Sequence, residues 1–276
     1  MARPLASALD PELGQRVGSS VVLATIALVA AVLGGWAFVA LMTIAVVVMA
    51  REWARLAPGD RSGGWLSALT TAALPLAAVL LAAVGEPAWG AVTLGLGALG
   101  LAALALAQPG WRTLRIAAGV IYLGIPALAL VWLRGESPDG MRNLLWLLVV
   151  VWATDVCAYL VGRSLGGPKL APRVSPGKTW SGLLGGVAGA SALGGLAALV
   201  LGVGGWLAAV LGGALAVVGQ AGDLFESALK RRAGVKDSGR LIPGHGGLLD
   251  RIDGLLFAAP AFAGLVWLGL DLGAVR

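Results

Sequence analysis

Long apolar stretches alternate with short polar ones along almost the whole chain. A helix needs about 20 mostly apolar residues to cross a bilayer, and nine runs approach that length. The first two are separated only by Gly34-Gly35, so they form either a tight helical hairpin or a single span. The nine runs are roughly 17–34, 36–50, 65–84, 88–107, 114–133, 143–162, 181–201, 205–228 and 249–270. The pattern predicts an all-α, polytopic membrane protein with about nine transmembrane helices.

The polar segments divide the chain into three parts. We expect a polar arm at 1–16, a first group of transmembrane helices at 17–142, and a second group at 143–276 that carries the polar motifs. No small-residue cleavage site clearly follows the first apolar run, so that run is interpreted as an uncleaved anchor. Within the second group, small residues recur at four-residue steps and predict a close helix contact. They are Gly182, Gly186, Ala190 and Gly194.

Composition agrees with a membrane protein. Hydrophobic residues make up 58% of the 276 residues and charged residues only 12%, whereas a soluble domain carries about twice that charge. The net charge is +6, but the basic residues lie between apolar runs and not on one soluble face. This distribution argues against nucleic acid as a partner and favours anionic lipid or nucleotide phosphates. The single cysteine, Cys157, excludes an intrachain disulfide.

The positions of Lys and Arg predict the orientation. With nine spans and a cytoplasmic N-terminus, 17 of the 20 basic residues fall on the cytoplasmic side, and only Arg134, Arg142 and Arg276 fall outside. Cytoplasmic loops of membrane proteins carry such an excess. The two long loops, at 163–180 and 229–248, both fall on the cytoplasmic side. Long ordered loops tend to be functional, so we expect the active site there.

The first polar segment runs from Asp155 to Gly182. Asp155 lies within an apolar span, where an ionised carboxylate is costly. The loop that follows combines cations and hydroxyl groups, which suit a phosphate chain; an anchor loop that follows the positive-inside rule is the alternative. These side chains are Lys169, Arg173, Ser175, Lys178 and Thr179. A P-loop is excluded because Pro172 stands where that motif requires glycine.

The second polar segment runs from Gly222 to Gly254. The first part places Asp223, Glu226, Ser227 and Lys230 on one helix face. Asp250 and Asp253 lie three residues apart on the next helix. Salt-bridged helix ends are the alternative to a functional site, but charge of both signs is dense here in a chain otherwise poor in charge. Four cations of this segment can hold a polyphosphate: Lys230, Arg231, Lys236 and Arg240.

The carboxylates predict a metal site. Mg²⁺ selects carboxylate oxygens and keeps room for phosphate oxygens. We expect Asp223 and Asp250 to be its principal ligands, with Asp253 as a ligand or neighbouring partner. Glu226 should instead pair with Lys230 at i+4. His245 is the only histidine. A lone histidine in such a position is more often a loop residue than a catalyst.

These residues also carry a family resemblance. The runs Ser227-Ala-Leu-Lys230-Arg231, Lys236-Asp237, Pro243-Gly-His245-Gly-Gly and Asp250-Arg251-Ile-Asp253 resemble the signature of the phosphatidate cytidylyltransferases, also called CDP-diacylglycerol synthases. The run from Ser175 to Trp180 resembles a second motif of that family. The similarity is strong over about 150–257. One departure is Ser181, where many relatives carry Glu.

The resemblance implies a transferase of phospholipid synthesis that joins CTP to phosphatidate, giving CDP-diacylglycerol and pyrophosphate. The expected cofactor is Mg²⁺. The sequence leaves open whether a second metal or a monovalent cation shares the site, and whether the protein forms a homodimer. The candidate catalytic residues are Lys230, Arg231, Lys236 and Asp237. The candidate substrate-binding residues are Ser175, Lys178, Thr179, Ser227, Arg240, His245 and Arg251.

Two other functions stay open at the level of sequence. One is a transporter of an anionic solute, and the other is a CTP-dependent lipid-alcohol kinase that releases CDP. The high content of Ala, Gly and Arg is typical of a GC-rich bacterium. We therefore expect a multi-pass protein of the inner membrane with its active site on the cytoplasmic side.

Overall fold

The computed structural model describes residues 11–56, 64–107, 111–136, 138–202, 204–242, 246–270 and 272. The described part of the chain forms nine α-helices and one two-stranded sheet. The helices are α1 Pro11–Leu33, α2 Gly35–Arg55, α3 Trp65–Ala83, α4 Pro87–Ala107, α5 Trp111–Gly135, α6 Gly140–Leu165, α7 Trp180–Val200, α8 Gly205–Arg232 and α9 Leu249–Trp267. The strands are β1 Lys169–Ala171 and β2 Ser175–Thr179.

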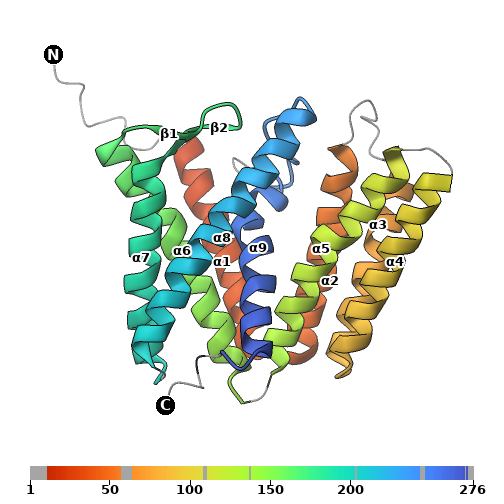
Figure 1. Cartoon of the computed structure of the whole chain (residues 1–276), viewed down its shortest axis with the longest axis horizontal. Helices are drawn as coiled ribbons and strands as arrows, with labels where there is room; N and C mark the ends of the chain where they lie inside the picture. The colour runs from red at the N-terminus through yellow and green to blue at the C-terminus, as the bar shows by residue number, and fades with distance from the viewer. Residues whose placement is uncertain are drawn as a thin grey trace.

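The helices match the nine predicted apolar runs, and the predicted fold class is confirmed. Seven of the described helices, α2 to α8, are long and apolar enough to cross a membrane. The apolar part of α1, Gly18–Leu33, is shorter, and α9 carries three charged residues in its first two turns. Successive helices run in alternating directions (Figure 1). The β1–β2 hairpin, the end of α8 and the start of α9 therefore lie at the same end of the bundle.

The first two apolar runs form a tight helical hairpin. Gly34 has φ 62° and ψ −155°, and Gly35 has φ 48°, conformations that glycine adopts without steric cost. The guanidinium of Arg134, at the end of α5, donates to the carbonyls of Ala31 and Val32. These bonds satisfy carbonyls that the end of α1 leaves open. Of the two interpretations that the sequence allowed, the structure therefore shows the tight helical hairpin and not a single span.

The small-residue stripe of α7 is a helix contact, as predicted. A Cβ added to Gly182 would lie 2.9 Å from the carbonyl oxygen of Ala158 in α6, and one added to Gly186 would lie 3.1 Å from that of Thr154. The indole N–H of Trp146 donates to the carbonyl of Gly194 at 2.8 Å. Small side chains let these two backbones approach closely, and α6 thereby holds α7 beside it.

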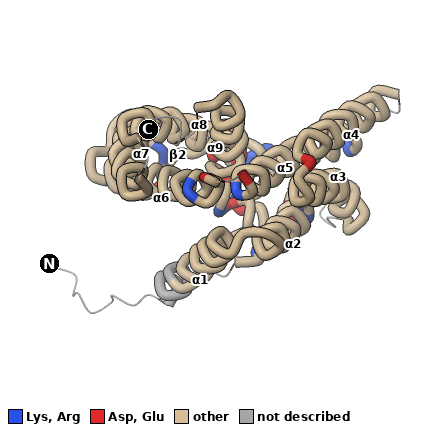
Figure 2. Tube along the Cα trace, turned by 90° about the horizontal axis from the view of Figure 1, so that it is seen from below, with Lys and Arg blue, Asp and Glu red and all other residues tan. Residues whose placement is uncertain are grey.

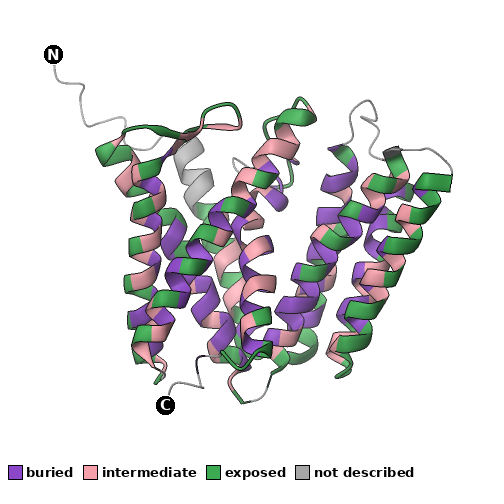
Figure 3. Ribbon diagram, in the orientation of Figure 1, coloured by how far each residue is buried: buried purple, intermediate pink, exposed green. Residues whose placement is uncertain are grey.

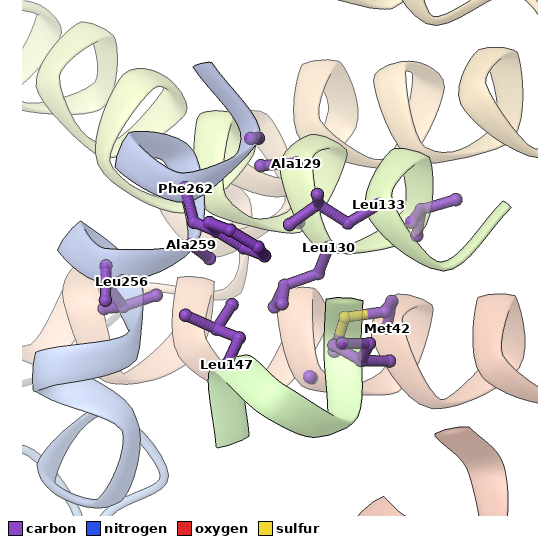
Figure 4. Close-up of a cluster of buried hydrophobic side chains, with 14 of the residues drawn as sticks. Met42, Ala129, Leu130, Leu133, Leu147, Leu256, Ala259 and Phe262 are labelled. Carbon is purple, nitrogen blue, oxygen red and sulfur yellow. The ribbon is translucent and has the colours of Figure 1, made fainter. Parts of the chain in front are cut away.

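Helix α9 has a buried apolar face in the core of the bundle. Phe262 is fully buried, with its ring centroid 4.9 Å from that of Trp146. The surrounding side chains come from α2, α5, α6 and α9 (Figure 4). They include Met42, Ala129, Leu130, Leu133, Leu147, Leu256 and Ala259. Burial is concentrated inside the bundle while the outward faces are exposed (Figure 3), and large apolar residues such as Leu66 and Leu106 lie on these outward faces.

The structure corrects the boundaries of both predicted loops. Helix α6 continues to Leu165, and α8 continues past residue 228 to Arg232. Three basic residues in the last turn of α8 stabilise its C-terminus by interacting with the negative end of the helix dipole. Most of the first loop is an antiparallel hairpin in which Lys169 pairs with Thr179 and Ala171 with Ser175. Its strands are short and contain Pro and Lys, so they lack the alternating pattern that predicts a strand.

We predict that Gly34→Ala destabilises the protein. An alanine at this φ and ψ is strained by about 1–3 kcal/mol, and its Cβ would overlap the guanidinium of Arg134. Thermal unfolding in detergent should show a lower Tm than that of the wild type.

Gly100→Ala is the control, because a Cβ at this position in α4 meets nothing within 4 Å. Its Tm should be unchanged or slightly higher, since alanine favours the helix. Equal Tm values for the two variants would show that the α1–α2 turn tolerates a side chain.

Candidate active site

The polar segments meet at the end of the bundle that carries the β1–β2 hairpin. Helices α3, α4 and α7 contain no Lys, Arg, Asp or Glu. Charged positions gather in the middle of the bundle around α5, α6, α8 and α9 when the molecule is viewed along its helices (Figure 2). The ion pairs of Lys178 on β2 and Lys230 on α8 place the candidate active site at the hairpin end.

Lys178 joins the hairpin to α8. Its ammonium lies 2.5 Å from Oδ2 of Asp223 and donates to Oε1 of Gln220 at 2.8 Å. The hydroxyl of Ser227, one turn further along α8, donates to Oδ1 of Asp223 at 3.3 Å. The first and second polar segments are therefore in direct contact, although they are far apart in the sequence.

Lys230 joins α8 to α9. Its ammonium lies 3.1 Å from Oε1 of Glu226 and donates to Oδ1 of Asp250 at 2.6 Å. The predicted i+4 pairing of Glu226 with Lys230 is confirmed. Glu226 is fully buried, and the ammonium of Lys230 faces it as an ion pair that does not meet hydrogen-bond geometry. The ammonium of Lys230 therefore compensates for the burial of two carboxylates at once.

Asp250 organises the loop between α8 and α9. Its carboxylate accepts hydrogen bonds from the backbone N–H of Ser238 at 2.9 Å and of Gly247 at 2.8 Å, and from the hydroxyl of Ser238 at 2.9 Å. Together with Lys230, these donors surround both oxygens. The loop is thus folded around a single carboxylate in the first turn of α9.

A second group of carboxylates comes from three helices. Asp155 of α6, Asp223 of α8 and Asp253 of α9 lie within electrostatic range of one another. Asp155 is also close enough to Lys178 and Arg251 to be attracted by their positive charges. Like charges this close repel one another unless a proton or a cation intervenes. Within the described residues, no group of three or more His, Cys, Asp or Glu side chains is close enough to enclose a metal ion.

Close packing of α8 on α9 brings Asp223 and Asp253 together. A Cβ on Gly222 would lie 2.7 Å from the carbonyl oxygen of Asp253, and one on Gly219 would lie 3.5 Å from that of Gly254. Larger residues at these glycines would push the helices apart. Asp253 itself accepts the N–H of Gly254 at 2.8 Å, so its carboxylate keeps acceptor capacity for a further partner.

The remaining predicted site residues have different surroundings. Thr179 is buried and caps α7 by accepting the N–H of Gly182 at 3.1 Å. Ser175 begins β2, and Arg231 donates to the carbonyl of Val174 at 3.3 Å. Four residues are exposed on or beside the α8–α9 loop: Lys236, Asp237, Arg240 and Arg251. His245 lies outside the described residues.

Three site residues were missed by the sequence reasoning. Gln220 contacts Lys178, Ser238 contacts Asp250, and Glu52 reaches the site from α2. Glu52 could have been noticed, because it is an isolated acidic residue just beyond an apolar run on the predicted cytoplasmic side. For Gln220 and Ser238 the sequence holds no such signal.

Aromatic rings connect α2, α5, α8 and α9 beside the charged groups. The ring of Tyr122 lies 5.3 Å from that of Trp53 and 5.4 Å from that of Phe225, measured between centroids. Phe225 in turn lies 5.5 Å from Phe257. Tyr122 is also within electrostatic range of Glu226, Asp253 and Asp223. The four helices are thus packed together at the candidate active site.

Comparison with known proteins agrees with the predicted resemblance. Residues 14–268 match the model of the cytidylyltransferase family. A phosphatidate cytidylyltransferase of Pseudomonas aeruginosa is 41% identical over 92% of this chain and 97% of its own length.

Two further relatives match about half of the chain. A phosphatidate cytidylyltransferase of Brucella suis is 59% identical over 52% of this chain, and one of Bacillus subtilis is 43% identical over 52%. The matched residues span 53% and 55% of these two relatives, about half of their length. From the match over nearly the whole sequence, the chain belongs to the cytidylyltransferase family.

Proposed function

We propose that this protein transfers the cytidylyl group of CTP to phosphatidate, giving CDP-diacylglycerol and pyrophosphate for phospholipid synthesis. The observation that carries the proposal is the meeting of Lys178, Lys230 and their carboxylate partners at one end of the helix bundle. The relatives named phosphatidate cytidylyltransferase support the choice of substrates.

The proposed reaction joins two anions. An oxygen of the phosphatidate phosphate forms a bond to the α-phosphorus of CTP. The bond from that phosphorus to the oxygen bridging to the β-phosphate breaks, and pyrophosphate leaves with the electron pair. A phosphate monoester is largely ionised near pH 7, so the attacking oxygen needs no general base.

The side chains of the site supply positive charge and orientation. Lys178 and Lys230 are anchored by carboxylates at fixed positions on the hairpin and on α8. Charge-assisted hydrogen bonds from such cations hold phosphates in place and lower the cost of bringing two anions together. Arg231 follows Lys230 on α8, and Lys236 and Arg240 lie in the loop after it; all three are exposed and would bind further phosphate oxygens.

The residues present fit a magnesium ion held partly by substrate. Mg²⁺ in phosphoryl-transfer sites is bound by one or two carboxylates and by phosphate oxygens. Asp253, close to Asp155, would provide one carboxylate, and Asp223 a second one by exchanging its contacts with Lys178 and Ser227 for the ion. Asp250 could join them only by releasing Lys230 or its backbone donors. When bound, the ion would neutralise charge on the phosphate oxygens.

We also propose that the site faces the cytoplasm at a bacterial inner membrane. Phosphatidate lies in the bilayer and CTP is dissolved in the cytoplasm, so the reaction requires a site at that edge. The hairpin end carries the loops with the basic excess.

A reporter active only in the cytoplasm should give no signal when fused to Arg276. A bright fusion would contradict the orientation.

The activity itself is tested with purified protein in detergent. CTP, phosphatidate and Mg²⁺ should yield CDP-diacylglycerol and one pyrophosphate per turnover. With diacylglycerol in place of phosphatidate, transfer of the γ-phosphate to its hydroxyl and release of CDP would identify a lipid-alcohol kinase instead. Uptake of an anionic solute by proteoliposomes, without lipid product, would identify a transporter.

Removal of single carboxylate charges tests the site. We expect Asp223→Asn and Asp250→Asn each to lower kcat by about 100-fold or more at millimolar Mg²⁺. Asp223→Asn loses the partner of Lys178 and a candidate metal ligand, while Asp250→Asn loses the partner of Lys230 and of the loop. Steady-state kinetics with CTP and size-exclusion elution in detergent provide the measurement.

Asp139→Asn is the matched control, because Asp139 pairs with Arg142 at 2.9 Å at the other end of the bundle. Its kcat should equal that of the wild type. Wild-type activity and unchanged Mg²⁺ dependence in Asp250→Asn would remove that residue from the reaction.

A further inference from the structure

Glu52 is a buried acidic residue outside both polar segments. It lies near the end of α2, in the N-terminal group of helices, and only 2% of its surface is exposed. Burying a carboxylate is costly unless it is hydrogen-bonded. Its partners therefore identify what the residue does.

Among the described residues, the hydrogen-bond donors to Glu52 come from the α8–α9 loop and the start of α9. Oε1 accepts the N–H of Leu248 at 2.9 Å, and Oε2 accepts the N–H of Leu249 at 2.8 Å. The first N–H groups of a helix have no partner within the helix. Leu248 occupies the N-cap of α9, and its side chain cannot cap it. The carboxylate of Glu52 thus caps α9 from a helix almost 200 residues earlier in the chain.

The loop closes tightly around this carboxylate. A Cβ added to Gly239 would lie 2.8 Å from Oε1 of Glu52, and one added to Gly247 would lie 2.6 Å from it. Only residues without a side chain allow this approach. The fit fixes where the loop can lie relative to α2.

Ser238 extends the contact to the candidate active site. Its hydroxyl lies 3.3 Å from Oε2 of Glu52 and 2.9 Å from Oδ2 of Asp250. Asp250 in turn accepts the ammonium of Lys230 at 2.6 Å. A continuous chain of polar contacts therefore runs from α2 to the cation proposed to bind phosphate.

We propose that Glu52 is a positioning residue for cytidylyl transfer. It sets the start of α9 and, through Ser238, the place of Asp250 and Lys230. This inference rests on the proposed function. It assigns to the N-terminal group of helices a part in the reaction, although the family signature lies entirely in the C-terminal group.

The first test replaces the charge while keeping the size. In Glu52→Gln, glutamine keeps one carbonyl oxygen, which can accept only one of the two N–H groups that Glu52 holds. Its amide NH₂ is itself a donor, so the other N–H group loses its acceptor. We expect kcat, normalised to folded protein, to fall about tenfold to 100-fold. Hydrogen exchange at the amides of Ser238, Leu248 and Leu249 should become faster, while exchange in α3 and α4 stays unchanged.

Two further variants make the result specific. Glu86→Gln is the control, because Glu86 is exposed in the α3–α4 connection; its kcat and exchange should match the wild type. Ser238→Ala keeps the backbone but removes the hydroxyl between Glu52 and Asp250. It should lower kcat less than Glu52→Gln does, with faster exchange confined to the loop.

The outcomes separate this proposal from the proposed function. A wild-type protein that forms no CDP-diacylglycerol rejects the function, while the exchange data still report whether Glu52 holds the loop. With an active wild type, unchanged kcat in Glu52→Gln overturns the positioning role. The positioning role is also overturned if Glu52→Gln shows faster exchange throughout the molecule while its folded fraction keeps full activity. Where Glu52→Gln fails to fold, wild-type kcat in Ser238→Ala overturns it.

Discussion

Buried and half-buried carboxylates at the edge of the bundle constrain the whole hairpin end of this protein. An ionised group in such a place needs partners at short distance. Lys230 serves Glu226 and Asp250, Lys178 serves Asp223, and backbone N–H groups serve Glu52. Except for the Glu226–Lys230 pair within α8, each pairing joins two different elements. The charge requirement therefore determines how the hairpin, α2, α8 and α9 are held against one another.

This pairing depends on helices that approach closely. Glycines at the α8–α9 contact and along α7 remove the side chains that would keep backbones apart. In a bilayer, such contacts rely on packing because lipid is as apolar as the helix surface. The rigid apolar bundle, with Phe262 and Trp146 at its core, then supports a polar site at its end. Rigid elements hold functional groups more precisely than loops do.

The same arrangement suits the proposed reaction between a lipid and a soluble nucleotide. The apolar outer faces of the helices keep the protein in the bilayer, while the cations stand at its edge. Fixed cations that need little rearrangement are effective at stabilising the charge of a phosphoryl-transfer reaction. In this protein they are held in advance by acidic partners. The α8–α9 loop carries further exposed cations, Lys236 and Arg240, which would add to the anchored ones in the proposed reaction.

The sequence by itself determined the fold class, the approximate positions of the nine described helices, and the two polar segments that meet in the candidate site. Apolar runs of membrane length and a long polar signature are local features, and local features can be seen without coordinates. The pairing of Glu226 with Lys230 followed from helix periodicity for the same reason.

Other features were decided only by the tertiary structure. The β1–β2 hairpin, the contacts of Gln220 and Ser238, and the capping of α9 by Glu52 depend on segments that are distant in the sequence. Their partners are mostly backbone groups, which leave no pattern of residue types. A carboxylate can accept N–H groups from any residue that the fold brings near, so only the packing of α2 against the loop reveals what Glu52 holds.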